Sequence, residues 1–205
     1  MTRKPFMRRY LARAVAVLAF LTATFLLATP AKAQSTSIPI LNPQFNDDTL
    51  PCSPSGNCNS YGITGWITGP QTYVLKASTS QFPSAPASGL YIANIGTGTS
   101  SGSILQTVGA TVQANTTYVL SAEVGARADV VFTGYELKLM AGNVTLNSGH
   151  HATPVGGTFV TEVIDYQSGA TPAQLGQPLQ IFIKSTGNGT TAISNVALTS
   201  TPTAP

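Results

Sequence analysis

Charged residues, cysteines and histidines are all scarce in this chain, and each shortage excludes a class of protein. Lys, Arg, Asp and Glu together make up 8% of the 205 residues, and there are 2 Cys and 2 His. Nucleic-acid-binding proteins cluster basic residues to replace phosphate counterions, but here they are scattered after residue 33. No long apolar pattern with a period of 3.6 residues follows that point either, which argues against a helical domain. The sequence therefore predicts no nucleic-acid partner.

The first 33 residues have the organisation of an export signal. A basic start that includes Arg8 and Arg9 precedes an apolar run over residues 14–28, and Ala31-Lys32-Ala33 ends the segment. Small residues at these last positions are what a signal peptidase recognises, so we expect cleavage after Ala33. The apolar run is shorter than the roughly 20 residues that a membrane span needs. We therefore expect a secreted or periplasmic protein, without a transmembrane segment once residues 1–33 are removed.

Removal of this segment reverses the net charge of the chain. Six of the 10 basic residues lie within residues 1–33, so the remaining four face all 7 acidic residues. Thr, Ser, Gly and Asn are abundant in what remains, as in extracellular β-proteins whose exposed strand positions carry neutral polar groups. We expect one domain over residues 34–199 and a flexible tail over residues 200–205.

The two cysteines, Cys52 and Cys58, have five residues between them in a segment rich in Ser, Pro and Gly. In an exported chain such a pair predicts a disulfide that closes a small surface loop. The alternative is a metal or redox pair, but the spacing matches neither Cys-x-x-Cys chemistry nor the usual zinc sites. We therefore predict a structural disulfide.

Short runs with alternating apolar and polar residues recur between turn residues. The clearest lie over residues 117–126, 135–141 and 178–184, and this alternation is typical of strands with one face on a core and one towards water. Weaker strand candidates lie over residues 63–68, 72–76, 90–95, 103–108, 143–146, 158–166 and 192–199. Roughly ten strands with regularly spaced turns predict an all-β sandwich.

Motifs near the two ends of this region indicate which sandwich to expect. Asn42-Pro43-Gln44-Phe45 and Gly65-Trp66 stand near its start, and Asn195-Val196-Ala197-Leu198 stands near its end. Their order resembles galactose-binding-like jelly rolls, particularly secreted carbohydrate-binding modules. The resemblance implies a jelly-roll β-sandwich. Many such modules bind a structural calcium through acidic residues at the positions of Asn46 and Ser194, so the resemblance does not favour calcium here and we expect no cofactor.

Three features could carry catalysis, and each has a simpler structural explanation. Residues 98–102 match the G-x-S-x-G pattern of serine hydrolases, but a predicted strand follows where that chemistry needs a helix. The pair His150-His151 has no metal-ligand spacing and fits an exposed loop. The carboxylates of Glu123, Asp129 and Glu136 could form a glycosidase pair, although cross-strand ion pairs explain them as well. We therefore expect no catalytic residue, no metal site and no enzyme activity.

The polar faces of two predicted strands indicate a binding site. Alternation places Glu123 and Arg127 on the polar face of one strand, and Gln180 and Phe182 on the polar face of another. If both strands share a sheet, the four side chains combine one stacking ring with hydrogen-bonding groups, the mixture that saccharides require. We predict an exported, non-catalytic binding module for extracellular polysaccharide or cell-surface glycan. The alternative is a structural or adhesive envelope protein that acts through protein contacts and binds no specific sugar.

Overall fold

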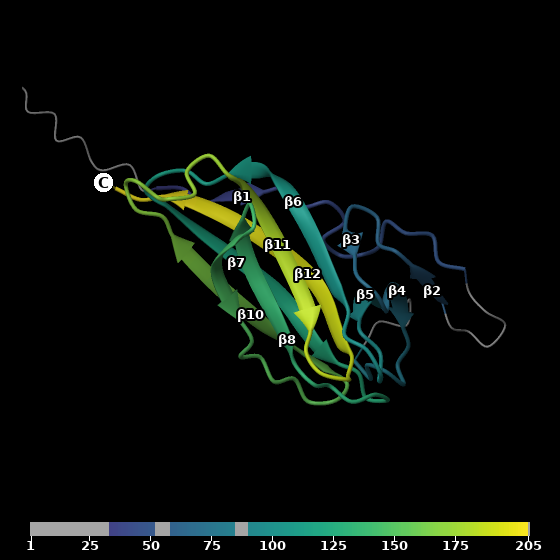
Figure 1. Ribbon diagram of the computed structural model, residues 1–205. Helices are drawn as coiled ribbons and strands as arrows, with labels where there is room; N and C mark the ends of the chain where they lie inside the picture. Colours follow the sequence, from purple (N-terminus) through teal and green to yellow (C-terminus); the bar gives the residue numbers. More distant parts are fainter. Residues whose placement is uncertain (1–32, 52–57, 85–89, 205) are drawn as a thin grey trace, which may run out of the picture. The chain divides into compact units, whose positions relative to one another are not determined.

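The structure, a computed structural model, describes residues 33–51, 58–84 and 90–204 and folds them into two stacked β-sheets (Figure 1). All regular elements in these ranges are strands. They are β1 (Thr36–Ile38), β2 (Cys58–Tyr61), β3 (Ile67–Thr68), β4 (Thr72–Ala77), β5 (Leu90–Ile95), β6 (Ser103–Thr111), β7 (Thr116–Ala126), β8 (Tyr135–Ala141), β9 (Val144–Gly149), β10 (Thr158–Gln167), β11 (Pro178–Ser185) and β12 (Thr191–Pro202).

The larger sheet has seven strands and the smaller has five. The order in the larger sheet is β10-β7-β12-β5-β4-β2, and β1 pairs with the last part of β12. The order in the smaller sheet is β3-β6-β11-β8-β9. Neighbouring strands are antiparallel throughout. The prediction of an all-β sandwich is therefore confirmed, and no helix in the described ranges is long and apolar enough to span a membrane.

Alternating side chains build the core between the sheets. In β11, Leu179, Ile181 and Ile183 are fully buried, whereas Gln180 and Phe182 point the other way and are half-buried. The strands β7 and β8 alternate in the same manner. Because each strand contributes one apolar face, the two sheets bury a continuous core between them. The three strongest alternating runs of the sequence are thus strands of this sandwich.

The opening motif forms a tight turn held by side chains. Trp66 is buried beside Phe45, with 5.7 Å between ring centroids, and its indole Nε1 donates to the carbonyl of Asn42 at 3.3 Å. The Asp48 carboxylate accepts hydrogen bonds from the Thr64 amide at 3.1 Å and from its hydroxyl at 2.6 Å. The Asn42 amide nitrogen also donates to Asp48, at 3.1 Å. The motif therefore ties the start of the domain to the segment before β3.

The end of the chain continues a strand, and one of the two cysteines lies outside the described residues. The flexible tail expected over residues 200–205 is wrong for its first part, because β12 continues to Pro202 and pairs there with Thr116. Threonine favours strands, and Pro202 is the last residue of β12, where its missing donor interrupts no further part of the strand. The predicted disulfide involves Cys52, which lies outside the described residues. The backbone of Cys58 begins β2 and pairs with Lys76.

Candidate functional site

A row of side chains crosses the outer face of the larger sheet, away from the core. Strand registers place one residue of each of six neighbouring strands in this row. In order across the sheet these residues are Tyr61, Tyr73, Asn94, Ala192, Gly125 and Phe159. Aromatic rings stand at both ends and the two smallest side chains lie in the middle. We call this row the floor of the outer face.

An apolar cluster separate from the core covers part of this floor. Its buried members are Leu75, Ala77, Phe82, Ile92 and Ala192, with Tyr73, Leu90 and Phe159 packed against them. Phe82 comes from the connection after β4 and is almost completely buried. Its ring stacks on Phe159, with 4.5 Å between centroids and 24° between planes. A Cβ at Gly125 would collide with the Phe159 ring, so the glycine lets that ring lie on the sheet.

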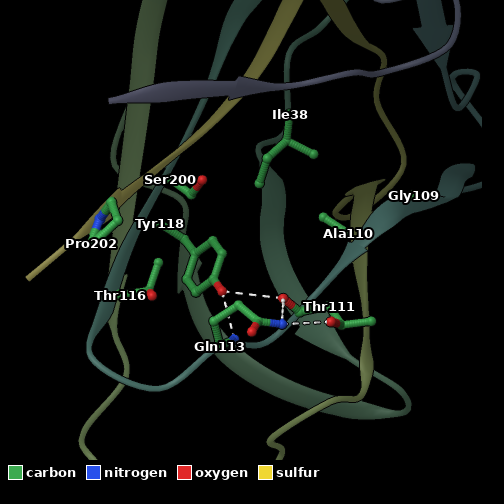
Figure 2. Close-up of a pocket in the computed structure, with 9 residues that line it drawn as sticks. All are labelled: Ile38, Gly109, Ala110, Thr111, Gln113, Thr116, Tyr118, Ser200 and Pro202. Atoms are coloured by element: carbon green, nitrogen blue, oxygen red, sulfur yellow. Dashed lines mark hydrogen bonds between the residues drawn. The ribbon is translucent and has the colours of Figure 1, made fainter. Parts of the chain in front are cut away.

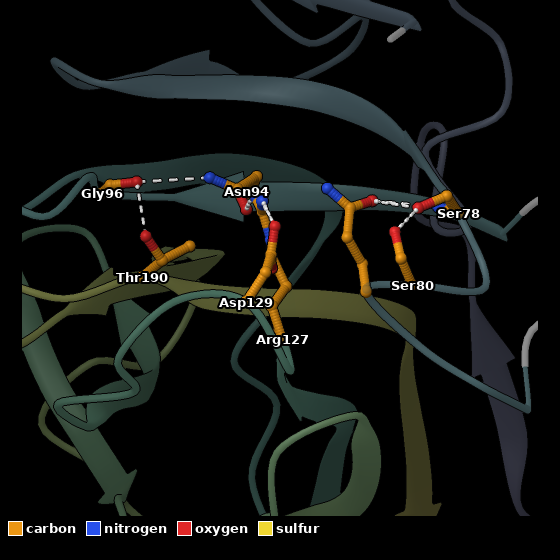
Figure 3. A network of polar contacts seen from close by, with 8 residues as sticks. Ser78, Ser80, Asn94, Gly96, Arg127, Asp129 and Thr190 are labelled. Carbon is orange, nitrogen blue, oxygen red and sulfur yellow. Dashed lines mark hydrogen bonds and ion pairs between the residues drawn. The ribbon is translucent and has the colours of Figure 1, made fainter. Parts of the chain in front are cut away.

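The polar centre of this face is Arg127, which follows β7 (Figure 3). Its Nε and Nη2 atoms donate to the two oxygens of Asp129 at 2.9 and 2.7 Å. Its Nη1 atom reaches Asn94 Oδ1 at 3.1 Å, and Asn94 Nδ2 donates to the carbonyl of Gly96 at 3.2 Å. The Arg127 side chain is only 11% exposed, whereas that of Asp129 is 43% exposed. A buried guanidinium thus presents a carboxylate to solvent in a fixed orientation.

The electrostatics of this pair keep both groups charged. The hydrogen bond from Arg127 lowers the pKa of Asp129, against the opposing effect of partial burial. Burial lowers the pKa of Arg127, but Asp129 and Tyr73 outweigh it and the net shift is upward. We call the rings Tyr61, Tyr73, Phe82 and Phe159, together with Asn94, Arg127 and Asp129, the aromatic patch.

A hollow of about 380 Å³ lies at the other end of β7 (Figure 2). Its lining includes Ile38, Ala110 and Pro202, and no charged side chain. The Tyr118 hydroxyl there donates to the carbonyl of Thr111 at 3.2 Å and accepts from the Gln113 amide at 2.8 Å. Because this hydroxyl is already paired and no Asp, Glu, His, Lys or Arg lines the hollow, the aromatic patch is the better candidate for chemistry.

The sequence model of the HpiC1 cyclase family matches residues 36–199, which is nearly the whole sandwich. The chain belongs to the HpiC1-like family. No curated protein sequence matches it significantly.

Solved structures share the fold of this HpiC1-like chain. An apo cyclase from Fischerella sp. is 22% identical, with a TM-score of 0.71 over 83% of this chain and 98% of that one. The Stig cyclase Fisc from Fischerella sp. TAU, crystallised with (3Z)-3-(1-methyl-2-pyrrolidinylidene)-3H-indole, is 22% identical with a TM-score of 0.72, covering 83% of this chain and 100% of that one. The module TmCBM61, in complex with β-1,4-galactotriose, is 18% identical with a TM-score of 0.52, covering 80% of this chain and 98% of that one. At these identities the likeness concerns the fold alone.

Membership in a cyclase family corrects the functional predictions. The expectations of a non-catalytic carbohydrate-binding module, of a polysaccharide partner and of no enzyme activity are wrong, because the family that matches is one of cyclases. The resemblance to carbohydrate-binding modules holds at the level of the β-sandwich. The physical reason for the error is that opening and closing motifs build the frame of the sandwich, as Trp66 does, and carry no information about chemistry on its faces.

The structure separates the four predicted ligand-binding residues into two pairs. Glu123 and Arg127 belong to β7 and the segment after it, on the outer face of the larger sheet. Gln180 and Phe182 belong to β11, on the outer face of the smaller sheet, where Lys138 Nζ lies 5.8 Å from the Phe182 ring. The condition that both strands share a sheet is therefore not met, and the four do not form one patch. Arg127 lies in the aromatic patch, and Glu123 pairs with the Thr161 hydroxyl at 2.7 Å.

The other candidate residues have structural partners. Glu136 accepts ion pairs from Lys138 at 3.0 Å and Lys184 at 2.9 Å, and the Lys184 hydrogen bond is the main cause that lowers its pKa. His150 lines a hollow of about 340 Å³ beside Glu136 and stacks on His151. In the part of the chain that the structure describes, no three His, Cys, Asp or Glu side chains gather as metal ligands. The segment over residues 98–102 turns and leads into β6 rather than into a helix.

A buried carboxylate at the side of the sandwich has a structural role. Glu162 accepts hydrogen bonds from the Tyr135 hydroxyl at 2.7 Å and the Ala152 amide at 2.9 Å, and its other oxygen lies 3.2 Å from His151 Nδ1. Burial raises the pKa of Glu162, but these hydrogen bonds outweigh it and the pKa is lowered. Burial and the neighbouring Glu162 raise the pKa of Tyr135. The network fastens the segment before β10 to β8.

Sequence reasoning missed most of the aromatic patch. Phe82 and Asn94 carry no motif, and Phe159 looks like an ordinary strand residue. One signal was available: Gly125 and Ala192 are small residues at outward positions of strands, and such gaps indicate that another side chain lies over the sheet there.

Proposed function

We propose that this protein closes a ring in a small organic molecule and that it does so on the aromatic patch. The observation that carries the proposal is the family match over residues 36–199. The geometry supports it, because the patch combines aromatic rings with an oriented, half-exposed carboxylate at Asp129. Sites for small molecules typically have this composition, mostly apolar with a few fixed polar groups.

Ring closure without oxidation begins when one atom of the substrate is protonated and ends when another atom loses a proton. Between these two steps the substrate carries a positive charge. In our proposal solvent water supplies the first proton, and the Asp129 carboxylate, which Arg127 keeps ionised, stabilises the positive charge and accepts the departing proton. Asp129 is half-exposed, so this proton then returns to solvent. The faces of Tyr73 and Phe159 attract positive charge as well. Arg127 acts as a positioning residue, since its two parallel hydrogen bonds fix the plane of the carboxylate.

A flat aromatic ring is the substrate feature that we propose for this site. The cyclase Fisc from Fischerella sp. TAU was crystallised with an indole compound, and another cyclase structure from the same source contains 4-(1H-indol-3-yl)butan-2-one. An indole on the outer face of this sheet would have Tyr73 and Phe159 as aromatic neighbours. We therefore propose an indole or a bicyclic ring of similar size.

We also propose that this chemistry takes place outside the cytoplasm. The basic start, apolar run and Ala31-Lys32-Ala33 site support cleavage after Ala33 and a secreted or periplasmic protein. The order of the opening and closing motifs, and the likeness to TmCBM61, support a jelly roll of the galactose-binding-like type for the sandwich.

Replacement of Asp129 by asparagine tests the proposed function. Purified protein is incubated with indoles that carry an alkenyl side chain, and products are sought by liquid chromatography and mass spectrometry as isomers of unchanged mass. Because Asp129→Asn keeps the shape but loses the charge and the basicity, we expect kcat to fall about 100-fold or more. The control is Phe182→Ala on the outer face of the other sheet, which should leave kcat unchanged. Full activity of Asp129→Asn would contradict the role of this carboxylate, and failure of the native protein to close any ring would contradict the function.

A further inference from the structure

The segment from Ser78 to Pro83, which we call the strap, lies over the outer face of the larger sheet and places Phe82 in the aromatic patch. We propose that Phe82 occupies the position of the ligand's aromatic ring, and that a flat aromatic ligand binds by displacing it. This inference rests on the proposed function for the location of the site. It adds a subsite for a planar ring, stacked on Phe159 and packed with Ala192, that Phe82 closes in this structure.

Phe82 fills a buried space against the outer face of the sheet. The residue is 1% exposed although it belongs to a connection rather than to a strand. Its ring stacks on Phe159 at 4.5 Å and packs with Ala192, which is small enough to leave room for a ring above the sheet. Stacking at this distance and with 24° between planes is one of the arrangements that aromatic rings prefer. The position therefore suits a flat aromatic ring.

Hydrogen bonds within the strap hold its residues together. The amides of Gln81 and Phe82 both donate to the carbonyl of Ser78, at 3.1 and 2.9 Å. The Gln81 side chain returns to the Ser78 amide at 2.9 Å, and the Ser78 and Ser80 hydroxyls lie 2.7 Å apart (Figure 3). Because these bonds lie within the strap, they survive when Phe82 leaves the patch. The strap can therefore move as one piece.

The strap contacts the rest of the domain at a few positions near Asp129 and Gly157. The Ala128 amide donates to the Gln81 carbonyl at 2.9 Å, and the Gln81 side chain helps to lower the pKa of the neighbouring Asp129 carboxyl. Pro83 packs at Gly157, where a Cβ would come within 2.8 Å of the proline ring. Two of these fastenings end beside the ion pair of Arg127 and Asp129. A ligand that engages Asp129 therefore competes with Gln81 and loosens the strap that holds Phe82.

Binding of indole alone, measured by isothermal titration calorimetry, tests this inference without any turnover. Phe82→Ala removes the competing ring, so we expect indole to bind about threefold to tenfold more tightly than to the native protein. Phe159→Ala removes the stacking partner and should weaken binding below the native level. Cyclohexanol, which has a ring that is not flat, should gain nothing from Phe82→Ala. Circular dichroism confirms that each variant retains its strands.

A second measurement follows Phe82 itself in the native fold. Protein labelled with 4-fluorophenylalanine is examined by ¹⁹F NMR, and Phe82→Leu identifies the signal of residue 82. Saturation with indole should move this signal towards the shift of a solvent-exposed ring. An unmoved signal, or equal affinity of Phe82→Ala and native protein, or the absence of indole binding to both, would overturn the inference. If the expected pattern appears but no ring is ever closed, the proposed function fails while the displaced-ring subsite stands.

Discussion

Replacing Arg127 by alanine is expected to reduce ring closure by at least 100-fold and to destabilise the outer face of the larger sheet. The guanidinium makes three hydrogen bonds, two to Asp129 and one to Asn94. Without it the Asp129 carboxylate loses its orientation and the main cause of its lowered pKa. Loss of one preorganised charged group in an active site typically costs this much in kcat. The fully buried Oδ1 atom of Asn94 also loses a partner, which costs about 1 to 3 kcal/mol of the free energy of unfolding.

Steady-state kinetics and urea unfolding of the same samples separate these two effects. Arg127→Lys retains a positive charge but lacks the planar fork, so it should restore stability more fully than kcat. Lys138→Ala, on the outer face of the smaller sheet, is the matched control and should change neither the activity nor the stability by much. An Arg127→Ala protein with native kcat would remove the Arg127–Asp129 pair from the mechanism.

The largest effect on stability is expected for Glu162→Ala, at about 3 kcal/mol in the free energy of unfolding. The carboxylate is 4% exposed and accepts hydrogen bonds from Tyr135 and Ala152. Its removal leaves a space between β10 and the segment that contains His151, and it leaves a buried amide with one partner fewer. Urea unfolding measures the loss, and Glu123→Gln on the outer face should stay within about 0.5 kcal/mol of the native protein. A loss below about 1 kcal/mol for Glu162→Ala would show that the network contributes little.

Three carboxylates, Glu162 among them, predict how the stability of the fold depends on pH. The pKa values of Asp129, Glu136 and Glu162 are all lowered in the folded protein. Such groups stabilise the fold above their unfolded pKa values of about 4, and the stabilisation is lost as the pH falls through the lower folded values. The free energy of unfolding should therefore fall below about pH 4, and Glu162→Gln should reduce that dependence. An identical pH profile for this variant would exclude Glu162 as a contributor.

The frame of the fold could be predicted from the sequence because it depends on local patterns. Alternation over residues 178–184 correctly assigned which side chains of β11 enter the core, and the same holds for β7 and β8. The short strands β1 and β2 were not predicted, because three or four residues carry too little periodicity. Their pairing depends on β12 and β4, which are far away in the sequence.

The candidate site could be predicted only in part, because it depends on which strands become neighbours. Arg127 was expected on a polar face, and it lies there. The partner strand was expected to be β11, whereas β7 joins the sheet in which β12, β5 and β4 follow it in order and carry Ala192, Asn94 and Tyr73. Alternation identifies the two faces of a strand but not the sheet that the strand joins. Phe82 was inaccessible to such reasoning, since a connection that folds back over a sheet has no period at all.

The apolar side chains of this protein form two sets, one in the core and one in the outer cluster. This division affects which substitutions the protein can accept during evolution. In β4 and β5, side chains that face the core alternate with side chains that face the patch, as Val74 does with Leu75 and Ala93 with Ile92. Selection for a new substrate can therefore act on one set of positions while the other set keeps the domain folded. Gly125 is the exception, because any larger residue there would displace Phe159. A substitution at Gly125 therefore requires a smaller residue at position 159 as well.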